Sequence, residues 1–97
     1  MAKRIKIENN TYELIKEYRD GYDEQAFQNL MTDYFDHYDY ILGDWSHNKL
    51  RLKGFCEKEN KKWNLTNDYA DIEDYIAHKC AYGCRYFIVK KVRTKES

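Results

Sequence analysis

The chain has 97 residues, of which 35% are charged and 42% hydrophobic, a composition typical of one small folded domain. Lys and Arg total 17, as do Asp and Glu, so the formal net charge of zero argues against strong bulk attraction to nucleic acid or a membrane. No apolar run approaches the ~18 residues that a membrane-spanning helix needs, so we expect no membrane association.

The first segment, residues 4–8, alternates apolar and charged side chains, which predicts a β-strand. Asn9 and Asn10 follow, and Asn tolerates the positive φ that a tight hairpin turn requires. We expect the return strand at residues 11–18. A short helix is the alternative there, because some of its apolar side chains also fit a helical spacing.

The sequence after Asp20-Gly21 predicts an amphipathic helix over about residues 24–37. Asp23 is a good N-cap, and Tyr22 and Phe27 occupy the two positions of a hydrophobic staple. Apolar side chains then recur every three or four residues. They are Phe27, Leu30, Met31, Tyr34, Phe35 and Tyr38.

Residues 39–45 and 49–55 predict a second hairpin around Ser46-His47-Asn48. A three-residue loop pairs Trp45 with Lys49. This register places Tyr40, Leu42, Leu50 and Leu52 on one face of the hairpin. It places Ile41, Trp45, Lys49, Arg51, Lys53 and Phe55 on the other. A one-residue slip would exchange the faces of every side chain.

Residues 57–66 read as a polar loop, and Thr66 or Asp68 caps a second helix at about 68–81. Gly83 is a natural stop for that helix. Residues 84–92 predict a last strand, which is apolar on both faces and therefore belongs in the interior of the sheet. We expect the tail, residues 93–97, to be frayed.

These elements give the order ββαββαβ in one domain spanning residues 1–97, with an ordered core at about 4–92. We predict an α+β fold, in which a single β-sheet has two helices packed on one face. Without the first strand the order is that of a ferredoxin-like domain, so that arrangement remains possible. The strand order is left open.

Three segments resemble the YutD-like family of small bacterial proteins, found mostly in Firmicutes. They are Tyr38-Asp-Tyr-Ile-Leu-Gly-Asp-Trp45, Leu50-Arg-Leu-Lys-Gly-Phe55 and the stretch from Cys80 to Lys90 with its Gly-Cys-Arg-Tyr-Phe motif. The resemblance covers roughly residues 11–93. It implies an α+β cytosolic protein. It does not point to a particular activity or to a catalytic residue.

The three cysteines, Cys56, Cys80 and Cys84, are an odd number, and no secretory signal leads the chain as given. We therefore expect free thiols and a cytoplasmic location. Cys80 and Cys84 are four residues apart, but a structural zinc site needs a second such pair. We expect no metal and no cofactor.

Charge is distributed unevenly along the chain. Residues 1–48 hold 5 basic and 10 acidic side chains, a balance of −5, whereas residues 49–97 hold 12 basic and 7 acidic, a balance of +5. Either the folded protein has separate acidic and basic faces, or the two halves neutralise each other.

A basic-aromatic face is the strongest candidate binding site. It comprises Trp45, Lys49, Arg51, Lys53 and Phe55. Open sheets that bind RNA pair stacking aromatic rings with phosphate-facing cations. Lys53-Gly54-Phe55 also matches the opening of a known RNA-binding pattern, although the match then fails. The competing interpretation is a solvated sheet face whose lysines discourage edge pairing.

Asp44, beside Trp45, is the one carboxylate that we consider as a catalytic centre, and no nucleophile, phosphate-binding or dinucleotide motif accompanies it. We therefore predict a non-catalytic binding module. Its partner would be RNA or a ribonucleoprotein at the basic-aromatic face. The alternative is a protein-interaction or assembly module using complementary charged faces, and an enzyme centred on Asp44 is least favoured. The oligomeric state is left open.

Overall fold

A computed structural model describes residues 3–7, 10–79 and 84–92. The strands are β1 (Lys3–Ile7), β2 (Asn10–Tyr18), β3 (Tyr40–Ser46), β4 (Lys49–Phe55) and β5 (Tyr86–Val92). The helices are α1 (Glu24–Leu30) and α2 (Ile72–Lys79), with 3₁₀ turns η1 (Asp33–His37) and η2 (Tyr69–Asp71). The predicted α+β class and the order ββαββαβ are confirmed, and residues 11–18 form a strand rather than a helix.

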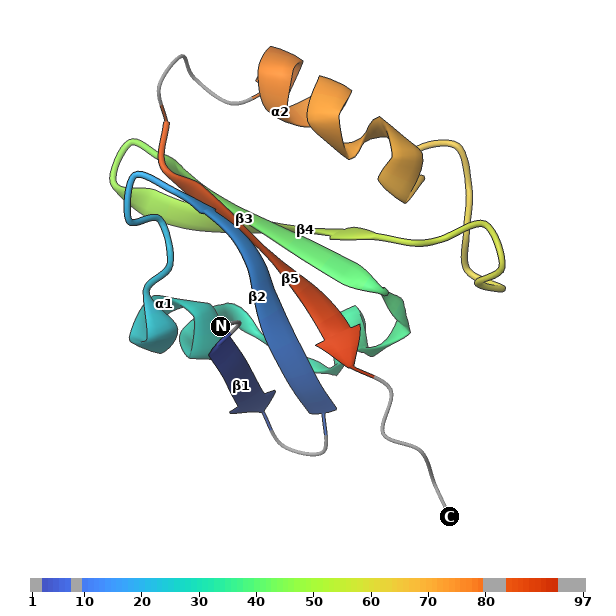
Figure 1. The fold of residues 1–97 in the computed structure, drawn as a ribbon, viewed down its shortest axis with the longest axis horizontal. Helices are drawn as coiled ribbons and strands as arrows, with labels where there is room; N and C mark the ends of the chain where they lie inside the picture. The colour runs from blue at the N-terminus through green and yellow to red at the C-terminus, as the bar shows by residue number, and fades with distance from the viewer. Residues whose placement is uncertain (1–2, 8–9, 80–83, 93–97) are drawn as a thin grey trace.

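All five strands form one antiparallel sheet in the order β1-β2-β5-β3-β4 (Figure 1). The last strand in the sequence, β5, lies at the centre, as its apolar side chains on both faces predicted. β1 occupies one of the two places beside β2, with β5 in the other.

The two helices lie on opposite faces of the sheet, so the prediction that both pack on one face is wrong (Figure 1). On the α1 face, Phe27 packs with Ile41 and Phe87. On the α2 face, Ile72 packs with Leu42, among others. The central strands carry apolar side chains on both faces, and each face needs its own cover. The ferredoxin-like arrangement is therefore not adopted, because its two helices share one face.

Helix α1 begins as predicted and ends earlier. The Asp23 carboxylate accepts a hydrogen bond from the Ala26 N–H at 3.1 Å, and Tyr22 contacts Phe27 with ring centroids 6.0 Å apart. The helix stops at Leu30, since Met31 and Thr32 are extended, and η1 starts a new turn capped by Thr32. The expected helix over 24–37 is thus two short pieces, which lets both Met31 and Phe35 reach the core on this face.

The second helical segment starts at Asp68, one of the two predicted caps. The Asp68 carboxylate accepts from the Ala70 N–H at 3.0 Å, η2 follows, and α2 continues from Ile72. The predicted end of this helix and its Gly83 stop lie outside the described residues, as does the tail at 93–97. Within the described segments, no helix has the length and apolar character needed to cross a membrane.

Candidate functional site

The β3–β4 hairpin has a two-residue turn rather than the predicted three-residue loop. His47 and Asn48 both have positive φ, 53° and 64°, as a tight turn that matches the twist of its strands requires. Trp45 therefore pairs with Leu50, and Ser46 pairs with Lys49. The predicted register is wrong by one residue, so the side chains of β3 and β4 are sorted differently between the two faces.

Trp45 lies on the α1 face, away from the other members of the predicted basic-aromatic face. Its indole Nε1–H donates to the backbone carbonyl of Gly21 at 2.7 Å. The Arg85 guanidinium lies 4.4 Å from the centroid of its ring. This half-buried ring is therefore held between a carbonyl and a cation, and it anchors the hairpin to the segment before α1.

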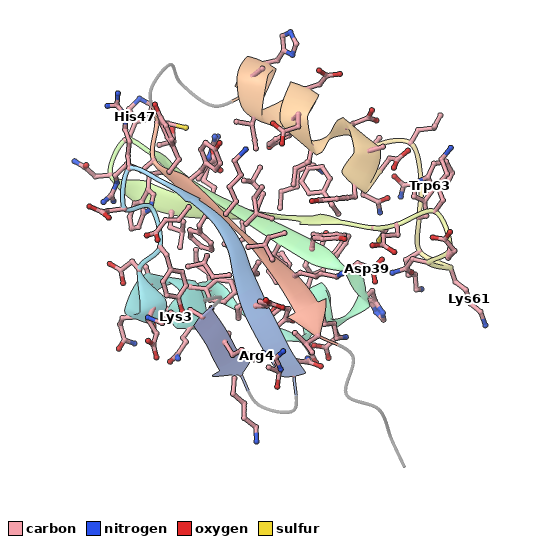
Figure 2. The ribbon with its side chains drawn as sticks, viewed as in Figure 1. Lys3, Arg4, Asp39, His47, Lys61 and Trp63 are labelled. Carbon is pink, nitrogen blue, oxygen red and sulfur yellow. The ribbon has the colours of Figure 1, made fainter. Side chains whose placement is uncertain are left out.

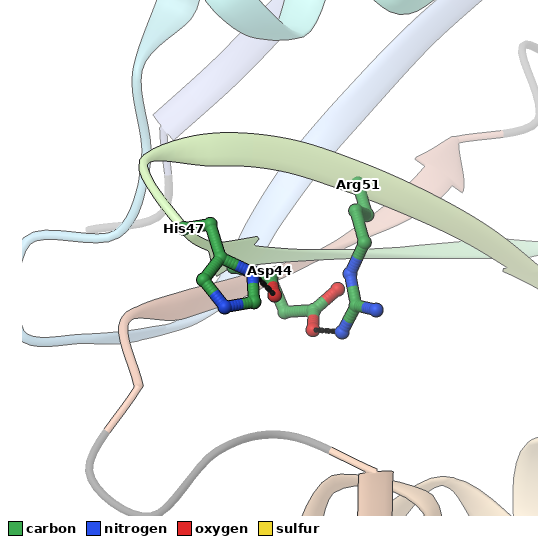
Figure 3. A network of polar contacts seen from close by, with 4 residues as sticks. Asp44, His47 and Arg51 are labelled. Carbon is green, nitrogen blue, oxygen red and sulfur yellow. Dashed lines mark hydrogen bonds and ion pairs between the residues drawn. The ribbon is translucent and has the colours of Figure 1, made fainter.

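Arg51 lies on the α2 face and binds a carboxylate of its own sheet (Figure 3). Its Nη2 lies 2.5 Å from Oδ2 of Asp44, the residue directly opposite on β3. Asp44 is only 3% exposed. Because this carboxylate is buried and bound to a guanidinium, the geometry gives no support to a catalytic centre at Asp44.

Lys53 and Phe55 also face α2, which covers them. Phe55 is 1% exposed and meets the ring of Tyr75 edge-on, with centroids 5.6 Å apart. The Lys53 ammonium lies 5.1 Å from the Phe55 centroid and 5.6 Å from that of Tyr75. Lys49, by contrast, is exposed at the start of β4. It directly follows the turn at which Figure 2 shows His47.

The five predicted binding residues therefore do not form one open surface. Trp45 lies on one face, Phe55 is buried under α2, and Arg51 and Lys53 have partners within the chain. Stacking of bases requires accessible rings beside unengaged cations. RNA binding through these residues stays a prediction, and the structure does not unite them in one stacking surface.

A different surface lies on the α2 face of β1, β2 and β5. Arg4 is directly opposite Glu13 on β2, and Glu13 is directly opposite Lys90 on β5. Directly opposed residues of antiparallel strands share a face, so these three side chains form a row of alternating charge across the sheet. Arg4 and Lys90 are exposed and Glu13 is half-buried. We call Arg4, Glu13 and Lys90 the charged row.

The row ends at a polar corner near the start of β3, where Figure 2 places Asp39. A cleft of about 380 Å³ lies there, lined by Glu13, Asp39, Glu57, Lys90, Lys91 and Val92. Asp39 Oδ2 accepts from the Glu57 N–H at 2.9 Å and from Asn60 Nδ2 at 3.0 Å. These bonds fix the carboxylate of Asp39 at the edge of the cleft.

Tyr40, the first residue of β3, is buried next to this corner and contacts Glu57, which lines the cleft. It stacks on Tyr69 with ring centroids 3.6 Å apart, and its hydroxyl donates to Glu57 Oε2 at 2.7 Å. Burial, together with that hydrogen bond, raises the pKa of Tyr40. The Lys90 ammonium lies 5.9 Å from the Tyr40 centroid. The charged row therefore continues into a hydrogen-bonded cluster that carries both carboxylate and ammonium groups.

The cysteines show no arrangement for chemistry in the part of the chain that the structure describes. Cys56 is buried, its Sγ lies 3.9 Å from the carbonyl oxygen of His37, and burial raises the pKa of its thiol. Cys84 is half-buried, and Cys80 lies outside the described ranges. Over those ranges, no cluster of three or more His, Cys, Asp or Glu could hold a metal ion.

Comparison with known proteins identifies the family of this chain. A family model described as "YutD-like: Putative antitoxin YutD-like" matches residues 6–90. The chain belongs to the YutD-like family. This confirms the resemblance seen in the three sequence segments. A relative from Bacillus subtilis (strain 168), named "Putative antitoxin YutD", is 39% identical over 89 residues, which cover 92% of this chain and 98% of the relative.

The YutD-like fold is also seen in a solved structure. The solution NMR structure of protein yutD from B. subtilis matches with a TM-score of 0.79 at 38% identity, covering 98% of this chain and 86% of that one. The chain and this solved structure therefore share one fold.

Sequence reasoning missed the charged row. The alternation of Arg4, Glu13 and Lys90 becomes visible only when β1, β2 and β5 are aligned, and β5 is distant in the sequence. The signal available was local: each of these residues alternates with a core residue in its strand, such as Ile5, Tyr12 and Val89. That pattern marks a solvent-facing side but does not say which strands adjoin.

Proposed function

We propose that this YutD-like chain is a non-catalytic, antitoxin-type protein that works by binding another protein at the charged row. The observation that carries the proposal is the row itself, Arg4, Glu13 and Lys90, next to a cleft of about 380 Å³. The family description and the named relative supply the antitoxin class. An antitoxin can act through binding alone, so it needs no catalytic centre.

The mixture of charges favours a protein partner over a nucleic acid. Glu13, Asp39 and Glu57 lie beside Lys90 and Lys91 at the cleft, and their carboxylates would repel a phosphate backbone. A protein can present basic and acidic side chains in the complementary order. Such complementarity speeds encounter and rejects wrong partners, because like charges brought together cost several kcal/mol.

The position of the row also favours docking. The apolar contacts of α2 fall on β3, β4 and β5, through residues such as Leu42, Phe55 and Ile88. Arg4 on β1 and Lys90 on β5 remain exposed on the same side of the sheet. A partner can therefore lie on the β1-β2-β5 half of this face beside α2.

The test is affinity capture from lysate of the source cells with three forms of the chain. They are the wild type, the charge-reversal variant Arg4→Glu/Lys90→Glu, and the control Lys61→Glu/Lys62→Glu in the exposed loop before α2. Each form is tested both with and without nuclease treatment of the lysate. Both variants change the net charge equally, so any difference between them reports position rather than total charge.

We expect the wild type and the control to retain one protein. The amount retained by Arg4→Glu/Lys90→Glu should be lower by at least about tenfold. Capture that disappears on nuclease treatment would instead favour nucleic acid. Equal capture by all three forms would place the interface elsewhere, and either result would overturn the proposal.

A further inference from the structure

A small pit opens on the α1 side of the sheet, away from the charged row. Its volume is about 50 Å³, and it is lined by Ile7, Asn10, Tyr12, Met31, Thr32, Asp33 and Asp36. A group about the size of one or two water molecules fits such a volume. The pit therefore suits one small polar group with a short apolar attachment.

Tyr12 lines this pit, and its hydroxyl is an unsatisfied polar group. Tyr12 is fully buried, and its oxygen has no hydrogen-bond partner among the described residues. Burial, with a smaller contribution from the nearby Asp36 charge, raises the pKa of Tyr12 to about 12, so the phenol is neutral at physiological pH. Leaving a buried hydroxyl unpaired costs free energy, so a bound group that hydrogen-bonds to it would be stabilised there.

The acidic side chains of the pit select a cation. Asp33 and Asp36 both line it, and Asp36 Oδ1 is held by a hydrogen bond from Asn10 Nδ2 at 2.8 Å. The same turn already binds one ammonium group, since Lys91 Nζ donates to the backbone carbonyl of Asp36 at 2.7 Å. The two carboxylates of Asp33 and Asp36 exceed the single ammonium of Lys91, so the site keeps a net negative charge.

The apolar part of the lining further limits which cations can bind. Ile7 and Met31 also line the pit, and they can pack against a methylene group. A primary ammonium on an alkyl stem offers three N–H donors and a thin apolar body. A guanidinium is planar and wider, with five donors in a fixed fork.

We propose that this pit binds a primary ammonium group, with Asp36 as its counter-ion and the Tyr12 hydroxyl as a hydrogen-bond acceptor. The site lies on the α1 face, whereas the charged row lies on the α2 face. The two proposals can therefore fail independently.

Methyl NMR tests the pit directly, because Ile7 and Met31 carry methyl groups that line it. Methylammonium chloride is titrated at constant ionic strength against tetramethylammonium chloride, which has the same charge but no N–H donor. Asp36→Asn and Tyr12→Phe are compared with wild type, and Asp71→Asn, an exposed acid before α2, is the matched control.

We expect saturating shifts of the Ile7 and Met31 methyl signals with methylammonium and not with tetramethylammonium. Asp36→Asn should weaken binding by at least about fivefold, the scale of one charge-assisted hydrogen bond. Tyr12→Phe should weaken it while the remaining spectrum shows a folded chain, and Asp71→Asn should bind like wild type.

A second titration with Nα-acetyl-lysine amide separates two sources of the ammonium. Saturation with this probe as well identifies a lysine side chain, and saturation with methylammonium alone identifies a free small amine. Equal, linear responses to methylammonium and tetramethylammonium, or unchanged binding in Asp36→Asn, would overturn the proposal.

Discussion

Arg51 and Asp44 face each other across the β3–β4 hairpin, and the guanidinium Nη2 lies 2.5 Å from the carboxylate Oδ2. The Asp44 side chain is 4% exposed, whereas that of Arg51 is 51% exposed. A buried carboxylate depends on such a partner because it has lost its hydration. This pair therefore makes Arg51 a structural residue of the hairpin, with its guanidinium bound within the sheet.

Replacing Arg51 by Met should destabilise the protein. The substitution removes a donor from the buried Asp44 carboxylate, at a cost of about 1–3 kcal/mol once the solvent exposure of Arg51 is allowed for. Urea unfolding followed by circular dichroism measures the change. The control Lys49→Met, two residues away on the same face, should stay within about 0.5 kcal/mol of wild type. Equal effects of both substitutions would contradict the structural role of Arg51.

Gly43 should not tolerate a side chain. A Cβ at this position would meet the buried ring of Phe87 on the neighbouring strand. We expect Gly43→Ala to cost about 1–3 kcal/mol, the usual penalty for overpacking a core. The double variant Gly43→Ala/Phe87→Leu should lose less than the sum of the single variants, because the smaller side chain relieves the clash. Simple additivity in thermal or urea unfolding would argue against this contact.

The turn at His47-Asn48 gives a test of the register. Asn48 has φ 64°, which glycine adopts without steric cost, so Asn48→Gly should stabilise the hairpin by a few tenths to about 1 kcal/mol. His47→Val should destabilise it by about 1–2 kcal/mol, because a β-branched residue resists the φ of 53°. A three-residue loop would not make the two substitutions act in opposite directions. If neither substitution changes the stability, the register predicted from the sequence is favoured instead.

Buried tyrosines should make the protein labile at high pH. Burial raises the pKa of both Tyr12 and Tyr22 to about 12, from about 10 in an unfolded chain. The folded state therefore holds these protons more tightly, so stability is intact below pH ~10 and is lost as the pH rises towards ~12. Titration followed by the ultraviolet absorbance of phenolate should show tyrosines that ionise well above pH ~10. The Tyr12→Phe variant should have one fewer of these tyrosines than the wild type. A titration complete near pH 10 in the folded protein would contradict the burial of these hydroxyls.

Local signals predicted the elements of this fold well. Asp23 caps α1, Tyr22 and Phe27 form the staple, and Asp68 caps the second helical segment, because each of these depends on neighbours in sequence. The central position of β5 also followed from its apolar side chains on both faces. These features needed no knowledge of distant contacts.

The arrangement of faces was harder to predict. An amphipathic stripe indicates that a helix covers a sheet but not which face it covers, so it does not separate helices on one face from helices on both. A signal did exist, since Ile41 and Leu42 are adjacent in β3 and both are fully buried, each on its own face. A strand that is apolar on both faces requires cover on both.

The candidate site depended on the register, which depended on one turn. Positive φ at His47 and Asn48, neither of them glycine, gave a two-residue turn where three residues were expected. That single step moved Trp45 away from Lys49, Arg51 and Lys53. The charged row could not be seen in advance, because Lys90 meets Glu13 only through pairing of β5 with β2.

Hydrogen–deuterium exchange of the chain, free and co-purified with its partner, tests the proposed interface most directly. We expect added protection in β1, β2 and β5 around Arg4, Glu13 and Lys90, with little change at the β3–β4 turn. Protection centred instead on β4 and the His47-Asn48 turn, with β1 and β2 unchanged, would contradict it.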